Sequence, residues 1–178
     1  KGKELKGKTI GIIGFGRIGQ ETAKIALGIG MNVLFTDKFV GKTQINLNLA
    51  NDKKISFDLE SSDMTELLKN SDFVSLHVPA QKSYVIGKNE FNLMKTGAGL
   101  INAARGGVVD EKSLIESLDS GKLAFAGVDT FENEPKPSVK LLMHPKVSLT
   151  PHIGAATNEA QDRIGIELAN QIMKLVKG

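Results

Sequence analysis

The sequence of 178 residues predicts an α/β fold, a doubly wound parallel sheet with helices on both faces. Two observations predict it. Short runs of apolar and β-branched residues alternate with amphipathic helical patterns, the order typical of βαβ units with right-handed crossovers. Polar and charged residues follow several of the predicted strands, and in such sheets ligands lie at the carboxyl ends of the strands. This length corresponds to one domain, residues 1–178.

The first predicted strand, residues 9–13, runs into three spaced glycines that form the pattern G-x-G-x-x-G. Gly14 permits a tight turn, Gly16 lets the backbone approach a pyrophosphate, and Gly19 lets the next helix pack close to the strand. That helix is predicted over residues 17–29, and its N-terminus would face the phosphates. Its apolar stripe consists of Ile18, Ala23, Ile25, Ala26 and Ile29.

A second strand, residues 31–36, ends at Asp37, which lies 18 residues after Gly19. An acidic residue at about this spacing accepts hydrogen bonds from the ribose of a dinucleotide. Strand, glycines, helix, strand and acid in this order predict a Rossmann-type dinucleotide-binding domain. The alternative is a tight βα turn that binds no ligand, and it leaves Asp37 unexplained.

After Asp37 the alternation of strand and helix patterns first weakens and then becomes clear again toward the C-terminus. Residues 38–58 are rich in Asn, Lys and Asp, with one short strand at residues 54–57. Further strands are predicted at residues 72–78, 98–103, 123–128 and 147–150. Helices are predicted through Leu67 and Leu68 and at residues 88–94, 110–118 and 158–176. The apolar stripe of the last and longest helix consists of Ala160, Ile164, Leu168, Ile172, Leu175 and Val176.

Composition narrows the classes of function. A net charge of +3 without a basic run argues against nucleic acid as a partner. The chain has no cysteine, and its three histidines stand outside any C-x-x-C or H-E-x-x-H pattern, so we expect no metal site. A run of about 18 apolar residues is absent, and no signal-like segment starts the chain. We therefore expect no membrane contact and a cytoplasmic location.

Five residues in or near the predicted loops have side chains suited to chemistry: His77, Arg105, Asp129, Glu134 and His152. Each also has a structural interpretation, as a packing residue, a solvated turn or a surface charge. Together they match a hydride-transfer site, which needs an anchor for an anionic substrate, a proton acceptor near neutral pH, and a group that orients the acceptor.

Four motifs in order make the comparison specific. They are G-F-G-R-I-G at residues 14–19, I-N-A-A-R-G-G-V-V-D-E at 101–111, G-V-D-T-F-E-N-E-P at 127–135 and T-P-H-I-G-A-A-T at 150–157. With them, nearly the whole chain resembles the D-isomer-specific 2-hydroxyacid dehydrogenases. The resemblance implies NAD as the cofactor and a small-molecule 2-hydroxy acid as the substrate.

The resemblance also implies roles for individual residues. His152 would be the acid/base, Glu134 would hydrogen-bond His152 and favour its protonated form, and Arg105 would bind the substrate carboxylate. The residues implied in cofactor binding are Gly14, Gly16, Arg17, Ile18, Gly19, Asp37, His77, Val78, Pro79, Ala103, Ala104, Arg105, Asp129, His152, Gly154 and Ala155.

The chain departs from the family pattern in three respects. Residues 77–83, H-V-P-A-Q-K-S, lack the Leu-Thr that usually follows the proline. Lys38 follows Asp37 in place of the common proline, which leaves NADP open. In this family the NAD-binding domain is inserted in a substrate domain, so the chain corresponds to an excised domain, inactive by itself.

Alternatives remain for activity and assembly. The substrate could be that of any family member, and an NAD-sensing protein of the corepressor type would keep similar residues. A homodimer or homotetramer is expected from the resemblance and from the apolar cluster Leu141, Leu142 and Met143. The alternative for this cluster is that it caps the edge of the sheet.

Overall fold

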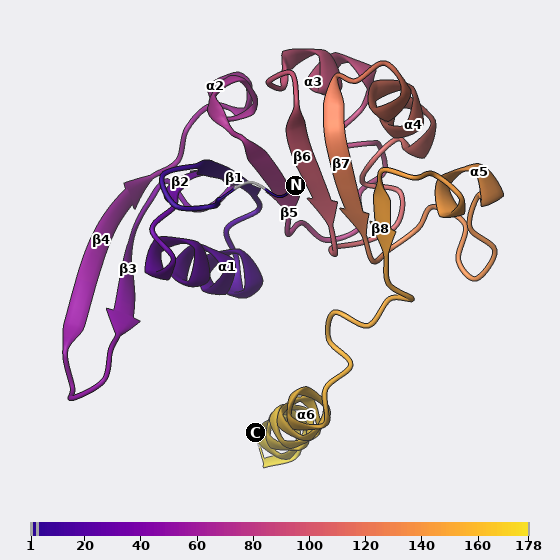
Figure 1. Cartoon of the computed structure of the whole chain (residues 1–178). Coiled ribbons are helices and arrows are strands. Elements are labelled where there is room, and N and C mark those ends of the chain that lie inside the picture. The colour runs from indigo at the N-terminus through magenta and orange to yellow at the C-terminus, as the bar shows by residue number, and fades with distance from the viewer. Residues whose placement is uncertain (1, 3, 178) are drawn as a thin grey trace.

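The computed structural model describes residues 2 and 4–177 (Figure 1). Six parallel strands form one sheet in the order β2-β1-β5-β6-β7-β8, and β3 and β4 pair separately. The strands are β1 Thr9–Ile13, β2 Asn32–Thr36, β3 Lys42–Asn48, β4 Lys54–Glu60, β5 Phe73–Leu76, β6 Ala98–Asn102, β7 Leu123–Val128 and β8 Val147–Leu149. The helices are α1 Arg17–Gly28, α2 Met64–Asn70, α3 Lys88–Leu93, α4 Glu111–Asp119, α5 Val139–Leu142 and α6 Asn158–Lys177.

The predicted doubly wound parallel sheet is confirmed. β1 is an inner strand that pairs with the edge strand β2 on one side and with β5 on the other, so the direction of winding reverses between β1 and β5. The crevice outside the carboxyl ends of two such strands is where open α/β sheets bind ligands. The loops that follow β1 and β5 therefore frame the candidate site.

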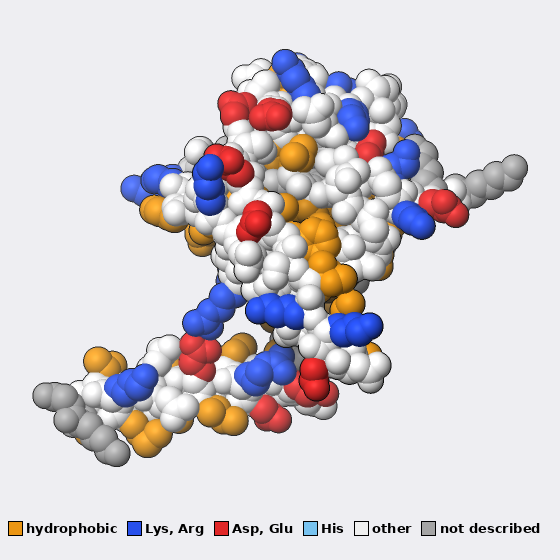
Figure 2. Space-filling model, turned by 90° about the vertical axis from the view of Figure 1, so that its left-hand side faces the viewer, with side chains coloured by type: hydrophobic (Ala, Val, Ile, Leu, Met, Phe, Trp, Pro, Cys, Tyr) orange, Lys and Arg blue, Asp and Glu red, His pale blue; other side chains and the backbone are white. Residues whose placement is uncertain are grey.

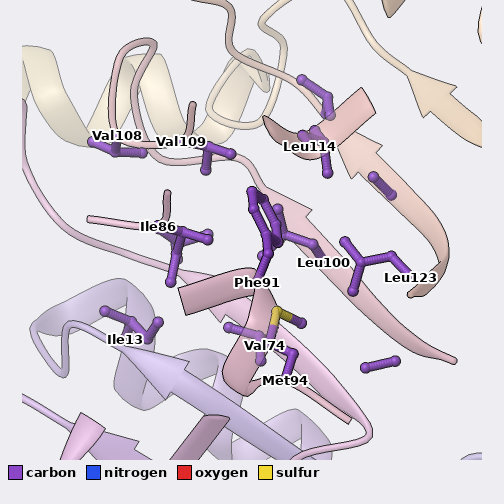
Figure 3. Close-up of a cluster of buried hydrophobic side chains, with 14 of the residues drawn as sticks. Ile13, Val74, Ile86, Phe91, Met94, Leu100, Val108, Val109, Leu114 and Leu123 are labelled. Carbon is purple, nitrogen blue, oxygen red and sulfur yellow. The ribbon is translucent and has the colours of Figure 1, made fainter. Parts of the chain in front are cut away.

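Two apolar clusters pack on opposite faces of the sheet. The larger one joins β1, β5, β6 and β7 to α2, α3 and α4, and Figure 3 shows Phe91 of α3 packed among Val74, Met94 and Leu100. The smaller one joins β1 and β2 to α1 and to Ile45 of the β3–β4 pair. Because both faces of the sheet are packed, the strands and the loops at their carboxyl ends are held in place.

The segment after β2 differs from the prediction. In place of a weakly patterned stretch with one short strand, β3 and β4 form an antiparallel hairpin that projects from the body (Figure 1). Its polar face is held by cross-strand pairs, among them Gln44 Nε2 to Asp58 Oδ1 at 3.0 Å. Alternation of period two was present in the sequence, but the many Asn and Lys residues of the polar face obscured it.

The apolar stripe predicted for α1 is only partly buried. Ala23 and Ala26 are buried, whereas Ile18 and Ile25 are 69% and 68% exposed. The physical reason is the close approach of α1 to the sheet, where a Cβ on Gly19 would collide with the carbonyl of Gly14. Only small side chains fit on that face, so the isoleucines lie on the outer face.

The last helix, α6, does not pack on the sheet. Its stripe residues Ile164, Leu168 and Ile172 are more than half exposed, and the helix stands apart from the body (Figures 1 and 2). An ion pair of 3.3 Å between Glu167 of α6 and Arg17 of α1 links it to the domain. Within the described part of the chain, no helix is long and apolar enough to cross a membrane.

The apolar cluster near residue 141 is divided. Leu141 lies in the short helix α5 and is fully buried in the larger core, so it caps the sheet as the alternative interpretation held. Leu142 and Met143 are 38% and 77% exposed. Of the three residues in this cluster, only Leu142 and Met143 are exposed enough to contact another chain.

Candidate functional site

The glycine loop between β1 and α1 has the geometry expected of a pyrophosphate cradle. Gly14 adopts a φ of +91°, and a Cβ there would lie 2.6 Å from the carbonyl oxygen of His77. A Cβ on Gly16, in contrast, would meet nothing within 4 Å, so the space above this residue is open. The first turn of α1 holds no acidic side chain that would repel an anion. The loop therefore fits a dinucleotide phosphate.

Asp37 follows β2 and lies against the same loop. Its carboxylate accepts hydrogen bonds from the backbone N–H groups of Phe15 at 2.6 Å and Phe39 at 2.7 Å, and from Val40. Burial raises the pKa of Asp37, but these three hydrogen bonds outweigh it and hold the pKa below its usual value. A fixed negative charge beside the glycine loop suits the adenosine ribose and opposes a 2′-phosphate.

The loop after β5 begins with His77, Val78 and Pro79. The imidazole of His77 is turned back toward Ser75, with 2.9 Å between His77 Nε2 and Ser75 Oγ. Burial lowers the pKa of His77. Its side chain therefore packs under the loop, while its carbonyl closes on Gly14. Val78 is half-buried and packs against the larger apolar cluster, whereas Pro79 is exposed.

The loop after β6 carries Ala103, Ala104 and Arg105. Arg105 is exposed, and its Nη1 donates to the carbonyl oxygen of Ala104 at 2.6 Å. Asn102, which the sequence analysis did not single out, shapes this loop: its side-chain amide donates to the Arg105 carbonyl and accepts from the Ala104 N–H, each at 3.2 Å. A buried asparagine at a strand end, followed by two alanines and an arginine, was the signal available.

Asp129 follows β7 and organises the segment after β8. It is 6% exposed and accepts hydrogen bonds from Thr150 Oγ1 at 2.6 Å and from the N–H groups of Ile153 and Gly154 at 2.8 Å. Burial raises the pKa of Asp129, and the bonds from Thr150 and the two N–H groups more than reverse this, so the pKa is lowered. In this structure Asp129 therefore holds the loop that carries His152.

His152 and Glu134 form a hydrogen-bonded pair. His152 Nδ1 lies 2.9 Å from Glu134 Oε2, and Glu134 Oε1 accepts the Phe131 N–H at 2.9 Å. The bond to His152 and then that to Phe131 lower the pKa of Glu134, which favours the carboxylate. Because Nδ1 is engaged, Nε2 is the ring atom that can exchange a proton with a bound molecule. His152 itself has a φ of +57°.

The pair borders an apolar cleft of about 410 Å³, whose walls include Phe131, Leu142 and Leu149. Among the described residues, no hydrogen bond or ion pair connects Arg105 to Glu134 or His152. Nor does the described part of the chain hold a group of three or more residues that could bind a metal ion.

A family model described as the D-isomer specific 2-hydroxyacid dehydrogenase, NAD binding domain, matches residues 1–154. The chain belongs to this family of NAD-binding domains. The hydroxypyruvate reductase of Thermotoga maritima is 46% identical to it over 98% of the chain and 55% of that protein. The D-3-phosphoglycerate dehydrogenase of Methanocaldococcus jannaschii is 42% identical over 100% of the chain and 33% of that protein.

Solved structures agree with this assignment. A glyoxylate reductase from Paecilomyes thermophila superimposes with a TM-score of 0.82 at 34% identity, over 97% of this chain and 50% of that one. The NAD-binding domain described here thus spans about half the length, or less, of the relatives it matches. Those relatives act on different acids, so they do not fix a substrate.

Proposed function

We propose that this chain is the NAD-binding half of an enzyme that transfers a hydride between a 2-hydroxy acid and NAD. The observation that carries the proposal is the 2.9 Å hydrogen bond between His152 Nδ1 and Glu134 Oε2, at the sheet edge that also holds the glycine loop. Oxidation of a 2-hydroxy acid requires a base, because the hydroxyl proton leaves with the C2 hydride. An imidazole supported by a carboxylate suits that task near neutral pH.

In this proposal each residue of the catalytic set has one task. His152 Nε2 accepts the hydroxyl proton while the carbonyl bond forms at C2, and Glu134 stabilises the imidazolium that results. Bound NAD supplies the acceptor for the hydride. Arg105 binds the substrate carboxylate. To do so, its guanidinium gives up the hydrogen bond to the Ala104 carbonyl and donates two N–H groups to the carboxylate.

The cofactor would lie along the strand ends from β2 to β8. The backbone at Arg17 and Ile18 would bind its pyrophosphate, and Asp37 would bind its adenosine ribose. Val78 and Pro79 would flank the adenosine. The residues that would line the nicotinamide end are Ala103, Ala104, Arg105, His152, Gly154 and Ala155. The open space at Gly16 and the low pKa of Asp37 support this course.

For the substrate we propose 3-phospho-D-glycerate first, which would be oxidised to 3-phosphohydroxypyruvate. Support comes from the run G-A-A-T-N-E-A-Q-D-R-I-G at residues 154–165, which resembles D-3-phosphoglycerate dehydrogenases, and from relatives of that activity. Glyoxylate and hydroxypyruvate, reduced in the opposite direction, are the second choice, because relatives with those names are similarly close.

We also propose that the chain works as one domain of a two-domain protein that assembles as a dimer or tetramer. The test of function uses that full-length protein, with NADH or NAD and each of these acids in turn. We expect turnover with at least one acid, and loss of turnover with intact NADH binding in His152→Ala. Tight NADH binding without turnover of any acid would instead indicate an NAD-sensing protein.

A further inference from the structure

Two glutamates outside the proposed catalytic set bind each other's backbone. The N–H of Glu111, at the start of α4, donates to Glu132 Oε1 at 2.9 Å, and the N–H of Glu132 donates to Glu111 Oε1 at 2.8 Å. The two residues are 21 positions apart: Glu111 is the first residue of α4, directly after the loop that follows β6, and Glu132 lies in the loop that follows β7. This reciprocal pair joins those two loops, and we call it the glutamate clasp.

The clasp brings two carboxyl groups close together in a partly buried position. Glu111 is only 7% exposed, and burial, with the nearby charge of Glu132, raises its pKa. The charge of Glu132 also raises the pKa of Tyr84, which lies in the loop that follows β5. Because the two side chains are both carboxylates, electrostatic attraction between them cannot hold the pair together. The pair is held by its two backbone N–H donors. One of them, the Glu111 N–H, belongs to the first turn of α4, where an N–H group has no acceptor within the helix.

The clasp restrains the segment that carries Glu134. Phe131 and Glu132 lie three and two residues before Glu134, and the Phe131 N–H donates to the Glu134 carboxylate at 2.9 Å. On the other side, Gly106 packs so closely on the Phe131 carbonyl that a Cβ there would collide with it. Gly106 follows Arg105. The Arg105 loop and the Glu134 loop are therefore held together by backbone contact and by the clasp.

We propose that Glu111 and Glu132 are positioning residues, which fix the carboxylate of Glu134 against His152 and the Arg105 loop. Neither residue lines the cleft beside Glu134 and His152; each side chain acts through the backbone N–H of the other residue. The catalytic consequence rests on the function proposed above, whereas the restraint on His152 does not depend on it.

Substitutions can separate geometry from charge. Glu132→Gln and Glu111→Gln keep a side-chain oxygen at the same reach and so keep the clasp, whereas Glu132→Ala and Glu111→Ala open it. Glu116→Ala is the matched control, because Glu116 lies on the same helix, is exposed, and takes part through its side chain in none of the described hydrogen bonds. Thermal unfolding shows which variants are folded at the temperature of the assay.

The first readout is the NMR titration of His152 in the 178-residue chain, which has only three histidines to assign. Glu134 and Asp129 are the charged groups that face this ring. Glu134→Gln should move the titration midpoint of His152 to lower pH and thus sets the scale. We expect Glu132→Ala and Glu111→Ala to move it in the same direction, and the two Gln variants and Glu116→Ala to leave it in place. An unmoved midpoint in both folded Ala variants would overturn the proposal.

The second readout is turnover in the full-length protein. We expect kcat to fall at least about 10-fold in Glu132→Ala, since a misplacement of about 1 Å can cost about 100-fold. The affinity for NADH should stay unchanged, and Glu132→Gln should restore kcat. An equal fall in kcat for the Gln and Ala variants would refute a positioning role. If the midpoint moves as expected but no acid is turned over, the clasp stands and the proposed function fails.

Discussion

Asp129→Ala should destabilise the domain and release the loop that carries His152. The buried carboxylate accepts three hydrogen bonds, from Thr150 Oγ1, Ile153 N and Gly154 N. A hydrogen bond to a charged group contributes about 1.5–3 kcal/mol, and water replaces part of it where the donors lie near the surface. We therefore expect a loss of about 3 kcal/mol in the free energy of unfolding. For a domain of this size, about 2–4 °C per kcal/mol then gives a fall of about 6–12 °C in Tm.

The pH dependence gives a second check on Asp129. Its pKa is lowered in the folded state, so its contribution is present above the pKa of the unfolded chain and is lost as pH falls through the folded value. The difference in Tm between the unaltered chain and Asp129→Ala, followed by circular dichroism, should thus be full at pH 7 and shrink below about pH 4. Thr150→Val, which removes one of the three donors, should cost less. A Tm change under 2 °C for Asp129→Ala, or a difference that persists at low pH, would refute the reasoning.

The other predictions concern the cofactor, the base and assembly. By calorimetry on the 178-residue chain, NADH should bind more tightly than NADPH, and Asp37→Ala should narrow the difference; equal or tighter NADPH binding contradicts the role of Asp37. Gly16→Val should fold normally, because its surroundings are open, yet weaken both cofactors. In the full-length protein Glu134→Gln should move the acidic limb of the oxidation rate to lower pH, since the histidine then loses its proton more easily; an unmoved limb would make Glu134 a structural carboxylate. In sedimentation, a mass near twice 19.1 kDa at micromolar concentration supports a dimer through Leu142 and Met143, and a clean monomer removes it.

The strands of the parallel sheet could be predicted because their signals are local. β1 and β7 match their predicted bounds, and glycines at a strand end leave few alternatives to a βα turn. The hairpin of β3 and β4 could not be predicted as easily, because its stability comes from cross-strand pairs that only the register reveals. The outer face of α1 was misassigned for a related reason. Isoleucine is the more apolar residue, but alanine is the one that fits against the sheet.

The candidate site follows the same division. The hydrogen bond between Glu134 and His152 matches the one that the resemblance implied, although 18 residues separate the two in sequence. For two other residues that the resemblance assigned to cofactor binding, the structure shows different contacts. The side chain of His77 turns inward to Ser75, and the carboxylate of Asp129 accepts hydrogen bonds from the loop that carries His152. The supporting residue Asn102 had only its place at a strand end before Ala103, Ala104 and Arg105 as a signal, and Glu132 had none. Their effect depends on which backbone N–H groups the fold brings to them.

Hydride transfer itself can be followed most directly with an isotope. The full-length protein is incubated with NAD and a 2-hydroxy acid that carries deuterium at C2, 3-phospho-D-glycerate first and then D-glycerate and glycolate, and the reduced cofactor is analysed by mass spectrometry. The account predicts one deuterium on the nicotinamide ring with at least one of these acids, and none with His152→Ala. Reduced cofactor without deuterium, or no reduced cofactor with any of the three acids, would contradict it.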